Sequence, residues 1–350
     1  HGAASNPPNR FERLHYEAEA AEDVGLAPDE LGPDLDVRYY RDPSRTIVAY
    51  NASPDVGFTA SVNPYRGCLH GCVYCFARPT HEYLGFSSGL DFETRILVKE
   101  DAPALLRRAL AAPSWRPQVV AMSGVTDPYQ PIERRLRITR RCLEVLAEFR
   151  NPVAIVTKSW LVTRDADLLA ELARVEAAAV SISVTTLDRE LQRRMEPRAP
   201  APAQRLAAIE ALARAGVPVG VLVAPVVPGL TEHEIPAILR AAADAGARHA
   251  GYVVLRLPHA LKQLVDEWLV RHHPERRDKV LGRVRALRNG SLYDPRWRIR
   301  QRGEGPFAEQ IAQLFALGLR RAGIPDAHPP LSVAHFRRPS GNDTRQLSLL

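Results

Sequence analysis

The stretch Thr59-Ala-Ser-Val-Asn-Pro-Tyr-Arg-Gly-Cys68-Leu-His-Gly-Cys72-Val-Tyr-Cys75 joins a short apolar strand to a loop that carries three cysteines. The glycines of this loop allow the backbone to turn tightly, so that three sulfur atoms can face one point. The chain has only four cysteines, and a secreted disulfide framework would spread more of them along the sequence. The clustering therefore predicts a metal centre in a reducing compartment. The fourth cysteine, Cys142, lies in an amphipathic segment and is expected to pack in the core.

Two kinds of metal centre fit three thiolates, namely zinc and an iron–sulfur cluster. A structural zinc site would need a fourth ligand, for which His70 is the nearby candidate. The spacing Cys-x3-Cys-x2-Cys without a second cysteine pair is atypical of zinc. Three protein ligands on a four-iron cluster would leave one iron open to another molecule. A non-catalytic zinc or iron–sulfur binding module stays open as an alternative to an enzyme.

The rest of the chain alternates apolar runs with amphipathic segments. Six runs have the composition of parallel strands buried on both faces, at residues 59–62, 119–122, 153–157, 179–184, 219–224 and 252–255. Between them, apolar residues three and four apart predict helices at 101–111, 138–149, 164–175, 202–215 and 232–245. This succession predicts an α/β fold, a partial TIM-type (β/α)6 barrel.

The composition divides the chain into four parts. Residues 1–57 are polar, contain several prolines and lack periodicity, which predicts an irregular extended N-terminal arm. Residues 58–257 form the predicted barrel. Residues 258–338, with helical patterns at 261–272, 276–288 and 306–322, are predicted to form a helical C-terminal extension. Residues 339–350 have the composition of a flexible tail.

The cysteine motif resembles that of a known family. Cys-x3-Cys-x-aromatic-Cys, with Tyr74 as the aromatic residue, is similar to the signature of the radical S-adenosylmethionine (radical SAM) enzymes. The resemblance implies a 4Fe-4S cluster on Cys68, Cys72 and Cys75, whose open iron binds S-adenosyl-L-methionine. It further implies that one electron, from a donor such as flavodoxin or ferredoxin, cleaves that cofactor to a 5′-deoxyadenosyl radical, which abstracts hydrogen from the substrate.

Cofactor-binding residues are expected at the carboxyl ends of the strands, where such barrels bind their ligands. By the resemblance, the segment after the second strand binds the methionine amino group, and a lysine after the third strand pairs with its carboxylate. Small hydroxyls of the fourth strand suit the ribose, and apolar groups after the fifth suit adenine. For each residue, capping or loop packing is the alternative role. The predicted cofactor-binding residues are Tyr74, Ser123, Gly124, Thr126, Asp127, Lys158, Ser181, Ser183, Glu196, Arg198 and Pro225. Arg256, after the sixth strand, is expected to reach the substrate.

Within the superfamily, residues 58–257 are most similar to the branch of spore photoproduct lyase, a DNA repair enzyme, through the Thr-Asp pair at 126–127 and the Thr-Lys-Ser triplet at 157–159. The lyases carry a cysteine before the first motif and a tyrosine after the third cluster cysteine, where this chain has Val125 and Phe76. The phrases Thr126-Asp-Pro-Tyr-Gln-Pro-Ile-Glu133 and Glu196-Pro-Arg198 resemble instead an uncharacterised lyase-like group of non-sporulating bacteria. The resemblance therefore implies lyase-like chemistry without fixing the substrate.

Charge and the chain end favour DNA as the substrate. The formal net charge is +7, carried mainly by arginines, which suits phosphate contact, although an arginine-rich genome would give the same bias. The terminal Gln346-Leu-Ser-Leu-Leu350 resembles the peptide with which bacterial repair proteins bind the sliding clamp. We therefore predict repair or modification of a damaged DNA base, with RNA, a peptide or a small molecule as alternative substrates.

Membrane insertion and secretion are not expected. The longest apolar run, 217–227, is too short to span a bilayer, and the first eight residues show no signal-peptide pattern. The sequence predicts a cytoplasmic protein without a membrane partner.

Overall fold

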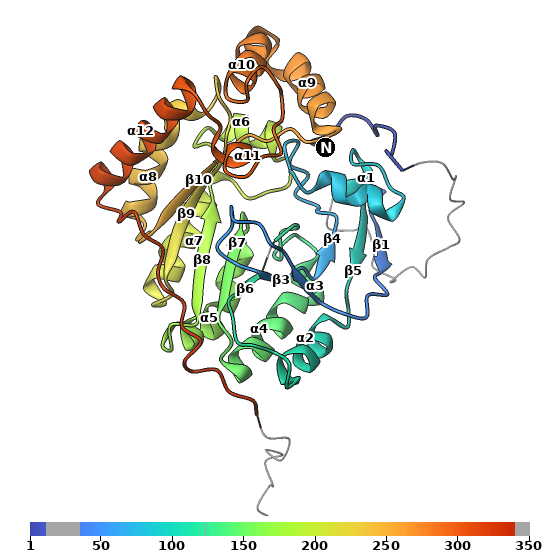
Figure 1. The fold of residues 1–350 in the computed structure, drawn as a ribbon, viewed down its shortest axis with the longest axis vertical. Coiled ribbons are helices and arrows are strands. Elements are labelled where there is room, and N and C mark those ends of the chain that lie inside the picture. The colour runs from blue at the N-terminus through green and yellow to red at the C-terminus, as the bar shows by residue number, and fades with distance from the viewer. Residues whose placement is uncertain (12–35, 123, 340–350) are drawn as a thin grey trace, which may run out of the picture.

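The computed structural model describes residues 1–11, 36–122 and 124–339. The predicted cofactor residue Ser123 and the clamp-like peptide Gln346–Leu350 lie outside the described residues. Figure 1 shows the chain as an α/β structure in which helices surround a curved sheet.

The main sheet has seven strands in the order β10-β9-β8-β7-β6-β3-β2. The six strands from β3 to β10 in this order are parallel, and β2 pairs antiparallel with β3 at one edge. Their bounds are β2 Val48–Tyr50, β3 Ala60–Val62, β6 Val120–Met122, β7 Val153–Thr157, β8 Ala178–Ser183, β9 Val219–Val226 and β10 Ala250–Val254. The predicted partial (β/α)6 barrel is thereby confirmed, because each of the six apolar runs forms one parallel strand.

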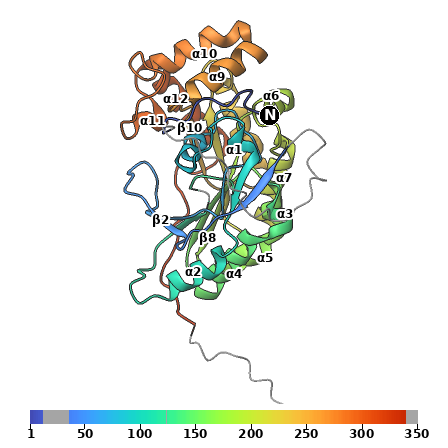
Figure 2. The same ribbon diagram turned by 90° about the vertical axis from the view of Figure 1, so that its right-hand side faces the viewer.

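Helices connect the parallel strands and cover one side of the sheet (Figure 2). They are α2 Ala102–Ala111, α3 Glu133–Leu136, α4 Ile138–Phe149, α5 Ala166–Ala173, α7 Pro202–Arg214 and α8 Ile235–Asp244, with 3-10 turns η2 Trp160–Asp165 and η3 Glu232–Glu234. The short helix α6 Arg189–Met195 lies instead beyond the strand ends, where its Leu191 and Met195 are buried in one apolar cluster with Cys72 and Trp268. Apolar side chains at helical spacing, such as Cys142, Val145 and Leu146 of α4, are buried against the strands. Cys142 is therefore a core residue, as the sequence predicted.

After β10 the chain is helical, with α9 Leu261–His272, α10 Pro274–Ala286, α11 Ile299–Arg302 and α12 Pro306–Ala322. In Figure 1, α12 lies beside α8, whereas α9, α10 and α11 lie beyond the carboxyl ends of β8, β9 and β10. These helices extend the wall of the barrel on the side where parallel strands present their ligands.

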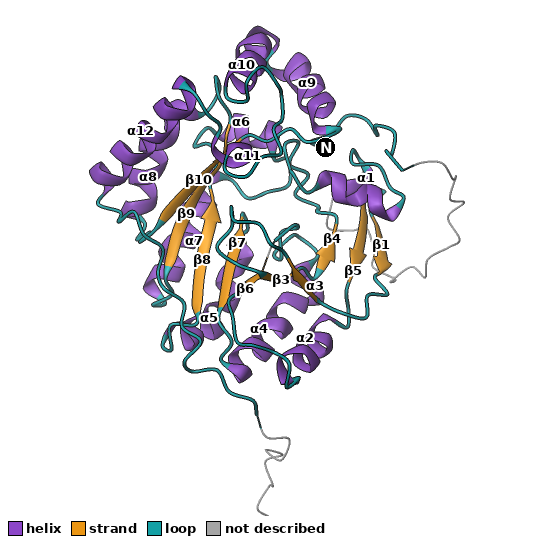
Figure 3. Ribbon diagram, in the orientation of Figure 1, coloured by secondary structure: helices purple, strands orange, loops and turns teal. Residues whose placement is uncertain are grey.

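A second, three-stranded sheet has the order β1-β5-β4 (Figure 3). Its strands are β1 Arg38–Arg41, β4 Tyr65–Arg66 and β5 Arg95–Val98, and the short helices η1 Arg78–Leu84 and α1 Asp91–Thr94 lie between β4 and β5. Residues 36–57 thus supply β1 and β2, one strand to each sheet. Sequence analysis did not predict this sheet, because its strands are short and interrupted by polar residues.

Among the described residues, no helix combines the length and the apolar composition that crossing a membrane requires.

Candidate active site

The three clustered cysteines lie on the loop between β4 and η1. All are free thiols, with Cys68 and Cys72 buried and Cys75 partly exposed. Burial raises the pKa of all three, to about 12 at Cys72, and the charges of Asp127 and of the other two thiols add to the effect at Cys68. A metal centre suits such a donor set, because its positive charge displaces the thiol protons. Within the described residues, no three His, Cys, Asp or Glu side chains are placed as ligands of one metal ion.

Two positions of the cysteine loop require glycine. Gly67 and Gly71 have φ angles of +78° and +66°, in the left-handed region. A Cβ atom on Gly71 would lie 2.6 Å from Oε2 of Glu93 and 2.5 Å from Nη2 of Arg198. The loop can therefore fold over these two charged side chains only because no side chain projects from residue 71.

A buried network of ion pairs and hydrogen bonds supports the backbone of the cysteine loop. Arg78 is fully buried and donates hydrogen bonds to the carbonyl oxygens of Gly71 (3.2 Å) and Cys72 (2.9 Å). Glu93 accepts from Arg78 at 2.5 Å and from Arg198 at 2.7 Å, and Arg198 also donates to the carbonyl of Leu69. The backbone amides of residues 2 and 3 donate to the same carboxylate. This network fixes the backbone on which the cysteines stand.

The segment after β6 holds the loop from another side. Thr126 donates its hydroxyl to the carbonyl of Tyr65 at 2.7 Å. The amide of Gln130 donates to the carbonyl of Gly67 (3.2 Å), and its oxygen accepts from the backbone amide of Leu69 (2.9 Å). Glu133 accepts a hydrogen bond from the Tyr65 hydroxyl. These contacts match the loop-packing role that sequence analysis kept as the alternative.

Asp127 ties the loop to the end of β7. Its carboxylate accepts from the Thr157 hydroxyl (2.7 Å) and the backbone amide of Lys158 (2.8 Å), and lies 3.4 Å from Nδ1 of His70. Burial alone would raise the pKa of Asp127, but His70 and these hydrogen bonds lower it to about 2. Asp127 is thus an ionised group that joins His70 of the loop to the end of β7.

Glu196 and Tyr74 form a second buried network. The Tyr74 hydroxyl donates to Glu196, which is also bonded to Thr185 (2.7 Å) and paired with the buried Arg205. Burial alone would raise the pKa of Glu196, but Arg205 and Lys158 lower it to about 2. The ammonium of Lys158 lies 5.8 Å from the centroid of the Tyr74 ring. Lys158 is therefore held beside the cysteine loop, with no carboxylate at ion-pair distance among the described residues.

The other predicted residues are distributed along the strands. Gly124 packs against Ser61 of β3, and Pro225 lies near the end of β9. Ser183 is buried on β8, whereas Ser181 of the same strand contacts His249 Nε2 at 3.1 Å. The structure thus gathers Tyr74, Thr126, Asp127, Lys158, Glu196 and Arg198 around the cysteine loop, and directs Ser181 toward the chain before β10.

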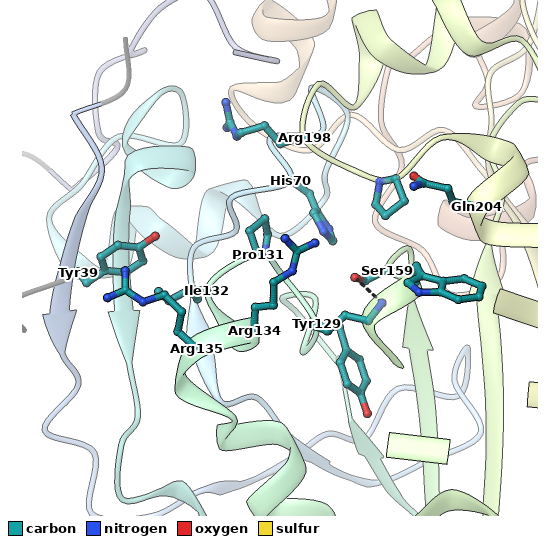
Figure 4. Close-up of a pocket in the computed structure, with 13 residues that line it drawn as sticks. Tyr39, His70, Tyr129, Pro131, Ile132, Arg134, Arg135, Ser159, Arg198 and Gln204 are labelled. Atoms are coloured by element: carbon teal, nitrogen blue, oxygen red, sulfur yellow. Dashed lines mark hydrogen bonds between the residues drawn. The ribbon is translucent and has the colours of Figure 1, made fainter. Parts of the chain in front are cut away.

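A cavity of about 630 Å³ opens beside the cysteine loop (Figure 4). Arg134, Ser159 and Gln204 contribute polar groups to its wall, and His70 and Arg198 belong to the networks described above. No cysteine lines this cavity, so it borders the site without containing the thiols.

Several residues of the site were missed by sequence analysis. Gln130 and Glu133 lie within the phrase that it quoted, and the polarity of Gln130 between Tyr129 and Pro131 was an available signal. Thr185 continues the run of small hydroxyls on the fourth strand, whereas Arg78, Glu93 and Arg205 gave no local signal, because their ion pairs join residues on different elements.

Comparison with known proteins defines the class of this chain. The family model of the radical SAM superfamily matches residues 62–242, and the chain belongs to this superfamily. It is a radical SAM enzyme, and the family implies S-adenosyl-L-methionine and an iron–sulfur cluster.

Individual relatives match between about half and four fifths of this chain. An uncharacterized protein of Mycobacterium tuberculosis is 40% identical over 280 residues, which cover 79% of each chain. An uncharacterized protein of Methanocaldococcus jannaschii is 29% identical over 173 residues, 49% of this chain and 62% of the relative. Among solved structures, spore photoproduct lyase complexed with dinucleoside spore photoproduct has a TM-score of 0.56 at 15% identity, covering 81% of this chain and 79% of the lyase. The predicted resemblance to this branch is thereby confirmed at the level of fold.

Proposed function

We propose that the chain uses a 4Fe-4S cluster, held by Cys68, Cys72 and Cys75, to cleave S-adenosyl-L-methionine and act on DNA, in the repair or modification of a damaged base. The observation that carries the proposal is the group of three free thiols on a loop held by polar residues from β4, β6, β7 and α7. When bound, the cluster and S-adenosyl-L-methionine would supply a 5′-deoxyadenosyl radical that abstracts hydrogen from the substrate.

The protein residues around the loop would orient and shield this centre. Arg78 and Gln130 hold the loop backbone at Cys72 and Gly67, and in our proposal this backbone carries the three sulfurs to the cluster. The ammonium of Lys158 lies 5.8 Å from the centroid of the Tyr74 ring, and in our proposal it pairs with the carboxylate of S-adenosyl-L-methionine. Phe76 stands where the lyase branch has a tyrosine, so it has no hydroxyl with which to return hydrogen to a product. We therefore propose a lyase-like reaction that differs in its final hydrogen transfer.

The DNA assignment is supported by charge and by fold. The formal net charge of +7 favours a polyanionic partner. A solved neighbour of the same fold, a spore photoproduct lyase variant, is bound to AdoMet and dinucleoside spore photoproduct. RNA, a peptide and a small molecule are the competing substrates, and a cytoplasmic reaction agrees with the free thiols.

Anaerobic reconstitution tests the cluster. Wild-type protein should bind four irons and absorb near roughly 400 nm through thiolate-to-iron charge transfer, and should release 5′-deoxyadenosine when reduced with lesion-bearing oligonucleotides. Cys68→Ala, Cys72→Ala and Cys75→Ala should each lose the absorbance and the release. The control Cys142→Ala should keep both, because this thiol is buried in the core. A colourless zinc-loaded protein, or full activity in a loop variant, would refute the proposal.

Two partners are part of the proposal. A small electron-transfer protein such as flavodoxin or ferredoxin would supply the electron, and reduced flavodoxin should support 5′-deoxyadenosine release where the oxidised form does not. The second proposed partner is the bacterial sliding clamp. The leucines of residues Gln346–Leu350 would fill an apolar groove on the clamp. Deleting them should abolish clamp pull-down while leaving the iron content unchanged. Equal pull-down by the truncated chain would exclude this role.

A further inference from the structure

Two arginines at the mouth of the barrel lack partners for part of their charge. Arg288, which follows α10, is 1% exposed, and its Nη2 atom donates to the carbonyl oxygen of Leu255 at 2.5 Å. Its Nε and Nη1 atoms are buried and have no hydrogen-bond partner among the described residues. Arg256, directly after β10, likewise has a buried Nε atom without a partner in the described part of the chain. Buried guanidinium donors are almost always paired, so these atoms are exceptional.

Burial makes the charge of both guanidinium groups unfavourable. Burial, followed by the charge of Arg256, lowers the pKa of Arg288 to about 10. Burial also lowers the pKa of Arg256, which Tyr293 partly offsets. Two like charges held together without an anion are unfavourable.

The nearest carboxylates are already committed to other cations. Asp294 pairs with Arg296 at 2.6 Å. Asp55 pairs with Arg300 at 2.5 Å and accepts from the backbone amide of Arg298. Arg296 also reaches Glu304 at 3.0 Å. Asp294 and Asp55 still raise the pKa of Arg288 and of Arg256, respectively, but among the described residues neither carboxylate forms an ion pair with these two arginines.

Arg256 lies next to the cysteine loop. The guanidinium of Arg256 is 4.9 Å from the ring centroid of Phe76, the residue after Cys75. Phe76 is 47% exposed, so part of its ring faces solvent. In Figure 1, β10 ends below α11 and α10, on the side of the barrel that faces the loop. A substrate reaching the cysteine site at this edge would pass Arg256 and an exposed aromatic ring, with Arg288 buried against Leu255.

We propose that Arg256 and Arg288 bind a phosphate group of the substrate, beside a base that stacks on Phe76. A phosphate offers several acceptor oxygens and one or two negative charges, which match the unpaired N–H groups of two guanidiniums. An exposed aromatic ring next to a phosphate site is the usual arrangement for single-stranded or flipped nucleotides. The inference rests on the proposed DNA substrate and assigns the residues that would hold its backbone.

The experiment measures binding by the full-length, metal-free chain, so it does not depend on cluster chemistry. A short fluorescein-labelled single-stranded oligodeoxynucleotide is titrated at several salt concentrations and followed by fluorescence anisotropy. Arg256→Gln and Arg288→Gln should each weaken binding about 10-fold and lower the salt slope by about 1. Arg256→Lys, which keeps the charge but loses the planar fork, should fall between wild type and Arg256→Gln.

The matched control is Arg214→Gln, which removes one exposed arginine that pairs with Glu210 on α7. It should leave the affinity within about 2-fold of wild type. Circular dichroism reports whether each variant folds, and if Arg288→Gln does not, the half-buried Arg256 variants decide the question alone. Unchanged oligonucleotide binding in Arg256→Gln would overturn the inference while leaving a DNA substrate standing.

Free phosphates separate the anion site from the DNA assignment. Inorganic phosphate and a nucleoside monophosphate should raise the melting temperature of wild type but not that of Arg256→Gln. If they do so while the oligonucleotide fails to bind, the phosphate site stands and the DNA substrate is wrong. If none of the three probes binds, the phosphate site itself is refuted.

Discussion

Replacing Glu93 by glutamine is expected to destabilise the chain strongly and to loosen the cysteine loop. Glu93 is fully buried and balances Arg78 at 2.5 Å and Arg198 at 2.7 Å. Glutamine preserves the shape of the side chain but removes its charge. The buried guanidinium of Arg78, which holds the carbonyl groups of Gly71 and Cys72, would then lose its counter-ion.

Two estimates give the size of the effect. Burial alone would raise the pKa of Glu93, but Arg78 and Arg198 are among the groups that lower it from 4.5 to about 2. At about 1.4 kcal/mol for each pH unit, this difference corresponds to about 3 kcal/mol of stability. Removing one partner of a buried ion pair typically costs about 3–5 kcal/mol. Both estimates predict a loss of about 3 kcal/mol in the free energy of unfolding.

Urea unfolding of the reduced, metal-free protein at neutral pH measures this loss. Because the folded-state pKa of Glu93 is lower than the unfolded one, its contribution is complete above about pH 4.5 and disappears as pH falls toward 2. The difference between wild type and Glu93→Gln should therefore shrink over that window. Iron content after reconstitution should fall in the variant.

The control is Glu210→Gln, which breaks the exposed pair with Arg214 and should cost less than about 1 kcal/mol. If Glu93→Gln were no less stable than Glu210→Gln, or if its deficit did not depend on pH, the charge network would not hold the loop as described.

Two further predictions concern the amino-terminal end of β10. His249 is buried and lies next to His328 and Ser181, and burial is the main cause that lowers its pKa to about 4. Between pH 6.5 and 4 His249 is protonated in the unfolded chain but neutral in the folded chain. The free energy of unfolding should therefore fall by up to about 3 kcal/mol as pH drops through this range. In His249→Gln, urea unfolding should show a shallower pH slope, and an identical slope would contradict the assignment. Gly220→Ala should cost about 1–3 kcal/mol, because a Cβ there would lie 2.2 Å from the carbonyl oxygen of His249. Gly282→Ala, in an open position of α10, should instead be neutral or stabilising in the same assay.

Much of the fold could be read from local patterns. The apolar run at 153–157 is β7, because a strand buried on both faces is apolar throughout. The pattern at 138–149 is α4, because a helix buried on one face repeats its apolar residues every three or four positions. The sheet β1-β5-β4 left no such signature, since a strand such as β4 is two residues long and is defined by its partner.

The site was predictable in its thiols and less so in their surroundings. Thr126 and Arg198 were selected for contact with a cofactor. The Thr126 hydroxyl donates to the carbonyl of Tyr65, just before the cysteine loop, and the Arg198 guanidinium donates to the carbonyl of Leu69 in the loop and to the carboxylate of Glu93. Sequence alone shows that a polar residue follows a strand, and whether that residue faces a ligand or a neighbouring loop depends on how the loops pack. For Arg256 the structure adds what the sequence lacks. Its Nε atom is buried without a hydrogen-bond partner among the described residues, and only the folded chain shows this.

By itself the sequence determined the class of protein, because three cysteines at fixed spacing after a first strand, followed by repeated βα units, are local features of the chain. Only the tertiary structure decided how that loop is held and where charge is left unpaired. Glu93 meets Arg198, and Arg288 meets Leu255, across long stretches of chain, and such contacts exist only after the barrel has closed. Burial then makes each of these charges costly to leave alone, which is why they mark the places where the protein holds its cysteines and, in our proposal, its substrate.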